Sequence, residues 1–224
     1  MSHKPMIYSH IHKGIRNRLF QISTKAARLD FGDKESVQKF QEEFAALMNN
    51  IHHHHNLEEK FIHPLLNDRV PGGADELEEE HRVVLHLMNN LVKNLDGIVA
   101  KPVDSEKRRE QGLEFYLAYN RFVVYFMDHL NDEEQDVQRY LWDLCSVQEV
   151  AKAVGELMAS QEPALAMENF GMIIASANLD EVTDLVIEAK ATVPEPVFQA
   201  GMSLAQSALN AREYAVLLSR VGVK

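Results

Sequence analysis

The chain has 224 residues, of which 46% are hydrophobic and 25% are charged, a composition typical of a folded globular protein. This balance excludes a disordered chain. The apolar runs, such as residues 122–127, are much shorter than the roughly 18 residues that a membrane-spanning helix requires. The first ten residues contain no apolar segment with a cleavage site, so we expect no secretion signal and a cytoplasmic protein.

Charge and cysteine content exclude further classes of protein. The formal net charge is -11, and no run of Lys and Arg offsets it, so we expect neither a nucleic acid nor a membrane as a partner. The single cysteine, Cys145, excludes an internal disulfide and any cysteine-rich zinc or iron–sulfur site.

Apolar residues recur at intervals of three and four along the first two thirds of the chain, which predicts long helices and no strands. The breakers between these helices are the turn at 30–33, the Pro-Gly-Gly segment at 71–73 and Lys101-Pro102, while Asp104 or Ser105 can cap the last helix. The predicted helices cover about residues 4–29, 35–67, 74–99 and 105–145. Short connections leave no room for crossovers, so we expect an all-α, up-down-up-down antiparallel four-helix bundle over residues 1–145.

Residues 146–224 are predicted to form a C-terminal helical extension. Its shorter amphipathic helices are expected at about 147–160, 162–177, 180–191, 194–209 and 211–221. The extension contains no histidine and no candidate chemistry. We expect it to pack against the bundle or against a second copy of the chain, as a homodimer.

The eleven histidines all lie between His3 and His129, and two of them begin the same motif. His-x-x-x-Glu-Glu begins at His54 and again at His129. A spacing of four residues places His54 and Glu58 about 40° apart around the helix axis, one turn above the other, and does the same for His129 and Glu133. Each pair therefore offers two donors on one helical face.

The apolar residues of each predicted helix indicate which face turns inward. His12, His54, His81 and His129 each lie in the apolar stripe of a different helix, so every helix of the bundle directs one histidine into the core. His55 lies about 100° from His54, at the edge of the inward sector, where it could fill a vacant ligand position. Four further histidines of these helices are predicted at the surface: His52, His53, His63 and His86.

A carboxylate in an apolar core destabilises a protein by several kcal/mol unless it is paired or binds a metal. Glu58 and Glu133 would both be buried, with no Lys or Arg on their stripes. This indicates a metal site. Four imidazoles and two carboxylates are too many ligands for one zinc ion and suit two iron ions, or less readily manganese.

Four motifs, in this order, resemble those of hemerythrin-like proteins, the HHE cation-binding family of four-helix bundles. They are His12-Lys-Gly-Ile-Arg16, the first His-x-x-x-Glu-Glu followed by Phe61-Ile-His-Pro-Leu65, Glu80-His81, and the second His-x-x-x-Glu-Glu. The resemblance implies a non-haem di-iron centre bridged by carboxylates and an oxo or hydroxo group. It implies six ligands, of which Glu58 and Glu133 are the bridges: His12, His54, Glu58, His81, His129 and Glu133.

Two features depart from the oxygen-carrying members of that family. Those proteins have a second histidine one turn after the third-helix ligand, where this chain has Leu85, and they place the last carboxylate five residues after its histidine, where Glu133 and Glu134 are both available here. Fewer ligands leave room for an exogenous one near both ions. We therefore expect binding or sensing of a small diatomic ligand (dioxygen or nitric oxide), of peroxide or of other reactive oxygen species. The alternatives are a di-iron peroxidase or oxidase, an iron-cluster repair protein, and a structural bundle.

Overall fold

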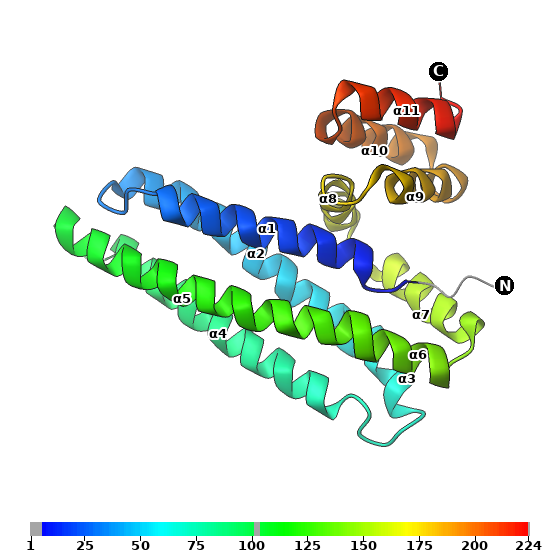
Figure 1. The fold of residues 1–224 in the computed structure, drawn as a ribbon, viewed down its shortest axis with the longest axis horizontal. Coiled ribbons are helices and arrows are strands. Elements are labelled where there is room, and N and C mark those ends of the chain that lie inside the picture. The colour runs from blue at the N-terminus through cyan, green and yellow to red at the C-terminus, as the bar shows by residue number, and fades with distance from the viewer. Residues whose placement is uncertain (1–5, 101–103, 224) are drawn as a thin grey trace. The chain divides into compact units, whose positions relative to one another are not determined.

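The computed structural model describes residues 6–100 and 104–223, and within these ranges every regular element is a helix (Figure 1). The predicted all-α fold is thus confirmed. The start of the first helix near Lys4 and the Lys101-Pro102 connection lie outside the described residues. No helix in the described ranges has the length and apolar character needed to cross a membrane.

The first part of the chain contains four long helices: α1 (Ser9–Arg28), α2 (Lys34–Phe61), α4 (Asp75–Ala100) and α5 (Ser105–Asp132). Short elements follow two of them: α3 (His63–Asn67), the π-helical turn η1 (Glu133–Val137) and α6 (Gln138–Leu144). The later helices are α7 (Val147–Ser160), α8 (Pro163–Ile174), α9 (Leu179–Thr192), α10 (Glu195–Ala208) and α11 (Ala211–Val221).

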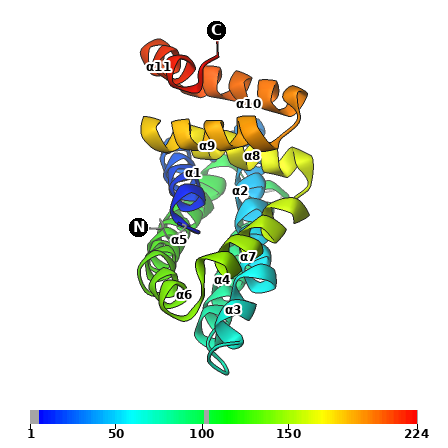
Figure 2. The same cartoon turned by 90° about the vertical axis from the view of Figure 1, so that its right-hand side faces the viewer.

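Contacts within the chain divide it into two units, and the larger one, residues 18–157, is a helical bundle. It contains the second half of α1, and α2 packs on α4, which packs on α5 (Figures 1 and 2). The helical bundle is as predicted, and its up-down-up-down order stays a prediction. The sequence-based boundary at residue 145 also stays a prediction, although the contacts group α7 as far as Leu157 with the bundle.

Local chemistry explains where the bundle helices begin and end. Asp33 caps α2 by accepting a hydrogen bond from the Glu35 backbone N–H, and Asp104 caps α5 by accepting one from Lys107. The sequence predicted one helix as far as residue 67, but α2 ends at Phe61. Pro64 explains the break, because proline lacks a backbone N–H and disfavours helical geometry in the residue before it.

An aromatic cluster fills the bundle where α2 and α5 meet the turn after α1. The rings of Phe40, Phe44, Phe115 and Phe31 contact one another with centroids 5.3–6.4 Å apart. Tyr119 extends the cluster and donates a hydrogen bond from its hydroxyl to the backbone oxygen of Leu19, 3.0 Å away. These buried rings hold three helices together, since aromatic contacts add to the free energy of apolar burial.

The second unit comprises, of the described residues, 6–17 and 158–223. Lys13 on α1 pairs with Glu181 on α9 at 2.5 Å, and Asn17 donates a hydrogen bond to Ser176 at 3.0 Å. The helices α8 to α11 of this second unit share one apolar core: Ile174, Val182, Val186, Phe198, Met202, Ala205, Leu217 and Val221. Among the described residues of this unit, His12 is buried and His10 is partly buried.

The aromatic cluster leaves no room for a side chain at Gly112 on α5, so we expect a larger residue at this position to destabilise the protein. A Cβ at Gly112 would lie 2.1 Å from Cγ of Phe31 and 2.5 Å from its Cβ. Alanine favours a helix by about 1 kcal/mol over glycine, but overpacking a core costs about 1–3 kcal/mol and this overlap is severe. We expect Gly112→Ala to lower the free energy of unfolding in urea, followed by circular dichroism. Gly155→Ala on α7, where a Cβ meets nothing within 4 Å, is the control and should raise it; equal gains in the two variants would contradict the packing argument.

Candidate metal centre

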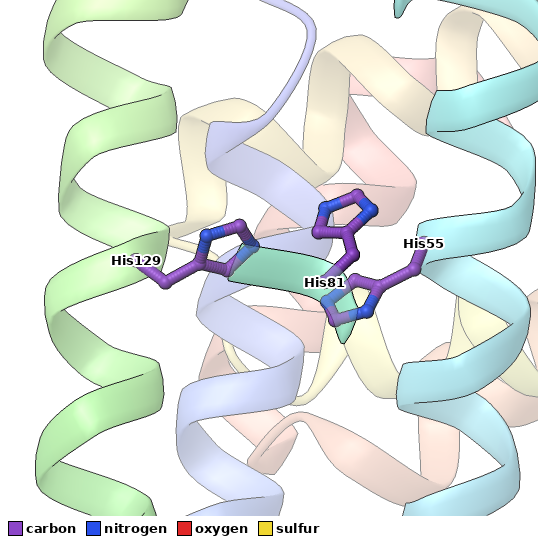
Figure 3. Close-up of side chains that lie close together, drawn as sticks. All are labelled: His55, His81 and His129. Atoms are coloured by element: carbon purple, nitrogen blue, oxygen red, sulfur yellow. The ribbon is translucent and has the colours of Figure 1, made fainter. Parts of the chain in front are cut away.

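Three histidines from three helices meet in the bundle core (Figure 3). His55 on α2, His81 on α4 and His129 on α5 are buried, and one ring nitrogen of each lies within 4.8 Å of the others. The rings of His55 and His81 are parallel, with centroids 3.9 Å apart. The ring of His129 is almost perpendicular to both, at 5.4 and 5.1 Å. Converging imidazoles of this kind are typical of metal sites.

Carboxylates form a second group of donors beside these histidines. Atoms of His54, Glu58 and Glu133 lie within 4.8 Å of one another. The Nε2 atom of His54 is 3.1 Å from Oε1 of Glu58, whose Oε2 atom is 3.7 Å from Nε2 of His81. Oε1 of Glu133 is 3.7 Å from Nε2 of His81 and 3.5 Å from Nε2 of His129. Glu58 thus lies between imidazoles of the two groups, and Glu133 lies near two imidazoles of the first group while belonging to the second, positions from which carboxylates can bridge two ions.

Two further glutamates orient the imidazoles from outside. The Nδ1 atom of His81 lies 2.9 Å from Oε1 of Glu59, and Nδ1 of His129 lies 2.8 Å from Oε2 of Glu80, so each carboxylate accepts a hydrogen bond from Nδ1–H. These bonds assign the lone pair to Nε2, the arrangement found in metal-binding histidines. In the described part of the chain, neither Nε2 atom has a hydrogen-bond partner. Their chemistry therefore fits that of metal ligands.

Burial governs the protonation of the donors. It raises the pKa of Glu58 well above its ordinary value, and the carboxylates of Glu133 and Glu59 raise it further. Burial likewise lowers the pKa of His55 well below its ordinary value, with a contribution from the neighbouring His81. Without a cation, the centre therefore disfavours charge on Glu58 and on His55. Bound cations would reverse this preference for the carboxylate, because metal ligands bind in their deprotonated form.

His129 differs from His55 in the direction of its pKa shift. Burial alone would lower the pKa of His129, but the carboxylates of Glu133 and Glu80 raise it above its ordinary value. The charge of Glu80 therefore stabilises positive charge on this imidazole. The same field would stabilise a cation bound at Nε2.

The helix changes geometry at Glu133. The Gln138 backbone N–H bonds to the Glu133 backbone oxygen five residues earlier, which defines the π-helical turn η1 between α5 and α6. Such turns insert one residue into a helix and are frequent at functional sites. Here the turn begins at a carboxylate that is completely buried, whereas Glu134, the other acid of the motif, is only partly buried. Glu133 is thus the residue that lies in the core.

The prediction that His63 lies at the surface is wrong. Because α2 ends at Phe61 and a new helix, α3, begins at His63, this residue is 1% exposed, with its ring centroid 5.2 Å from that of His81. Burial lowers its pKa to about 4, with a contribution from the neighbouring His81. The other histidines predicted at the surface, His52, His53 and His86, are exposed or partly buried.

The predicted six-residue ligand set stays a prediction, and the structure describes the surroundings of each member. Five members are buried in the bundle unit at the distances given above: His54, Glu58, His81, His129 and Glu133. His12, on the first half of α1, is also fully buried, and its ring centroid is 5.3 Å from that of Tyr8.

Sequence reasoning missed the roles of Glu59 and Glu80 and placed His55 only at the edge of the core. Glu59 and Glu80 are each adjacent in sequence to a predicted ligand, which is the signal that could have identified them.

Comparison with known proteins supports a metal-binding helical bundle. The family model described as the hemerythrin HHE cation-binding domain matches residues 7–141, which is more than half of the chain. No curated protein and no solved structure matched the chain. Proteins of this family bind metal ions, and the matched residues contain all of the buried histidines and carboxylates described above. The chain therefore belongs to the hemerythrin HHE cation-binding family.

Proposed function

We propose that this protein is a non-haem di-iron protein of the cytoplasm that binds or senses dioxygen, nitric oxide or reactive oxygen species. One observation carries the proposal: Glu58 lies within 3.7 Å of imidazoles in both donor groups, and Glu133, within 3.7 Å of His81 and His129, also has a carboxylate oxygen within 4.8 Å of a ring nitrogen of His54. A carboxylate in that position can bind one ion through each oxygen. The proposed ligands are His12, His54, Glu58, His81, His129 and Glu133.

The composition of the donor set supports iron. Imidazole and carboxylate together suit iron, whereas structural zinc prefers four ligands and often includes cysteine. The only cysteine, Cys145, is not among the potential metal ligands found in the described residues. Manganese accepts similar ligands but prefers a larger share of oxygen donors, so we rank it second.

His12 is proposed as a ligand because of its burial and its helix. It is 0% exposed, and α1 continues without interruption from Ser9 to Arg28. His12 also begins the first of the motifs that resemble the HHE family.

The surroundings of the donors favour a small exogenous ligand. Phe126 packs 5.6 Å from the ring of His55 and 5.7 Å from that of His129, and Ile51 and Leu130 are completely buried nearby on the same helices. An apolar wall of this kind excludes water and strengthens electrostatic interactions inside the site. Iron, when bound, would supply the open position and the electrons for a diatomic molecule or peroxide.

We expect protein purified without added metal to contain about two iron ions per chain by elemental analysis. Anaerobic removal of iron should lower the melting temperature, because a metal that binds only the folded state stabilises it. The near-ultraviolet absorption of the iron-containing protein should change when oxygen is removed or nitric oxide is added. Fewer than about 0.3 metal ions per chain, in protein that also fails to bind added Fe²⁺, would refute the proposal.

Replacement of one bridging carboxylate tests the arrangement within the site. Glu58→Gln preserves the shape of the side chain but removes its charge, so we expect the variant to lose at least one of the two ions. Glu42→Gln on the same helix is the control, because Glu42 is exposed. An unchanged iron content in Glu58→Gln would contradict the bridging role.

The outer carboxylate of Glu80 gives a further prediction. Glu80→Ala removes the hydrogen bond to Nδ1 of His129, and loss of such a partner typically weakens metal binding about 10- to 100-fold. Competition with an iron chelator measures this affinity. Glu79→Ala is the matched control, because Glu79 is exposed and bonds Arg82 rather than a histidine. If both variants retained the affinity of the unmodified protein, Glu80 would have no orienting role.

A further inference from the structure

We infer that His55 is a seventh protein ligand, which adds a third histidine to the ion held by His81 and His129. The inference rests on the proposed di-iron function. It assigns His55, on α2, a ligand position next to His54, so that two consecutive residues of one helix bind different ions.

The first support is geometric. His55, His81 and His129 extend from three different helices toward a common point (Figure 3). One ring nitrogen from each falls within 4.8 Å of the other two, which is close enough for a single ion among them. The separation of the His54 and His55 ring centroids is 5.9 Å, with a tilt of 43°, so the two consecutive imidazoles occupy different places.

The second support is the chemistry of the buried ring. His55 is 4% exposed, and in the described part of the chain its Nε2 atom has no hydrogen-bond partner. Stacking against His81 and contact with Phe126 satisfy the ring faces but not this nitrogen. A buried polar atom without a partner destabilises the folded protein, and a metal ion would satisfy it.

The third support is the sequence of α4. A second donor one turn after His81 would fall at position 85, which is occupied by Leu85, a side chain that cannot bind a metal. Leu85 is also 37% exposed, whereas Val84 and Met88 on the same helix are buried. Among its described residues, α4 therefore places one imidazole, that of His81, at the centre. The third imidazole comes from His55 on α2 and not from position 85.

A seventh ligand would make the two ions inequivalent. One ion would be bound by three histidines and the two bridging carboxylates. The other ion would be bound by the remaining proposed histidine ligands with the same bridges, which leaves it with fewer protein ligands.

The test compares His55→Leu with His63→Leu, in full-length protein loaded anaerobically with ⁵⁷Fe²⁺. His63 is an equally buried histidine that does not belong to either donor group, so its variant controls for loss of a buried imidazole. We expect two Mössbauer quadrupole doublets of equal area in the unmodified protein and in His63→Leu. In His55→Leu, one ion should bind at least tenfold more weakly in chelator competition, and one doublet should weaken or change.

Melting of the metal-free proteins separates a ligand from a structural residue. If His55 serves the metal, His55→Leu should melt at the same or a higher temperature than the unmodified apo protein, since an unsatisfied polar group is removed. Its gain in melting temperature on iron binding should be smaller. The inference would be overturned if metal-free His55→Leu melted at a lower temperature than the unmodified apo protein and its melting temperature rose by an unchanged amount on iron binding. His55→Gln, which keeps a polar side chain, provides the same comparison if His55→Leu does not fold.

The outcomes also separate this inference from the proposed function. If the unmodified protein does not bind two ions, the di-iron proposal itself fails. If it binds two ions and His55→Leu binds them with the same affinity and spectrum, only the role of His55 is overturned. Equal losses in His55→Leu and His63→Leu would also overturn it, because the effect would then not be specific to the ligand position.

Discussion

The centre of this protein depends on two carboxylates that are buried beside imidazoles, with no Lys or Arg buried among the described residues. Among the described residues, the buried charged and polar side chains include Glu58 and Glu133 but no Lys or Arg. Desolvation of such groups costs several kcal/mol each, and here each carboxylate also repels the other. A cation bound between them removes both penalties. The fold therefore carries an internal destabilisation that makes metal binding favourable.

That destabilisation is tolerated because the rest of the bundle is well packed. Along α5, ring contacts run without interruption from the aromatic cluster to the centre: Phe115 to Tyr119 at 6.3 Å, Tyr119 to Phe122 at 6.2 Å, Phe122 to Phe126 at 5.6 Å, and Phe126 to His129 at 5.7 Å. These rings fix the position of α5 before any ligand is bound. The donors are therefore preorganised, and little conformational entropy remains to be lost when an ion binds.

The helical period predicted most of the fold, and two helices, Val147–Ser160 and Ala211–Val221, were predicted with their observed bounds. The period could not predict where a backbone departs from it. Continuing the phase of α2 beyond Phe61 placed His63 at the surface, but the break before Pro64 resets the phase and turns this residue inward. The π-helical turn at Glu133 is a similar departure, since no residue pattern in the chain marks it. His55 was placed at the edge of the core because a helical wheel gives angles and not the width of the inward sector.

The outer carboxylates also determine the charge balance of the proposed centre. Glu58 and Glu133 lie inside it, and Glu59 and Glu80 bond the ligating imidazoles, which gives four negative charges when all four are ionised. Two divalent iron ions carry four positive charges, so the ferrous centre would be neutral overall. Two ferric ions would leave an excess of two positive charges in a buried site, where electrostatic interactions are strong. A bridging oxo group, which the resemblance to the HHE family implies, carries two negative charges and would balance this excess. The arrangement of carboxylates thus couples the oxidation state of the iron to the charge of the group that bridges the two ions.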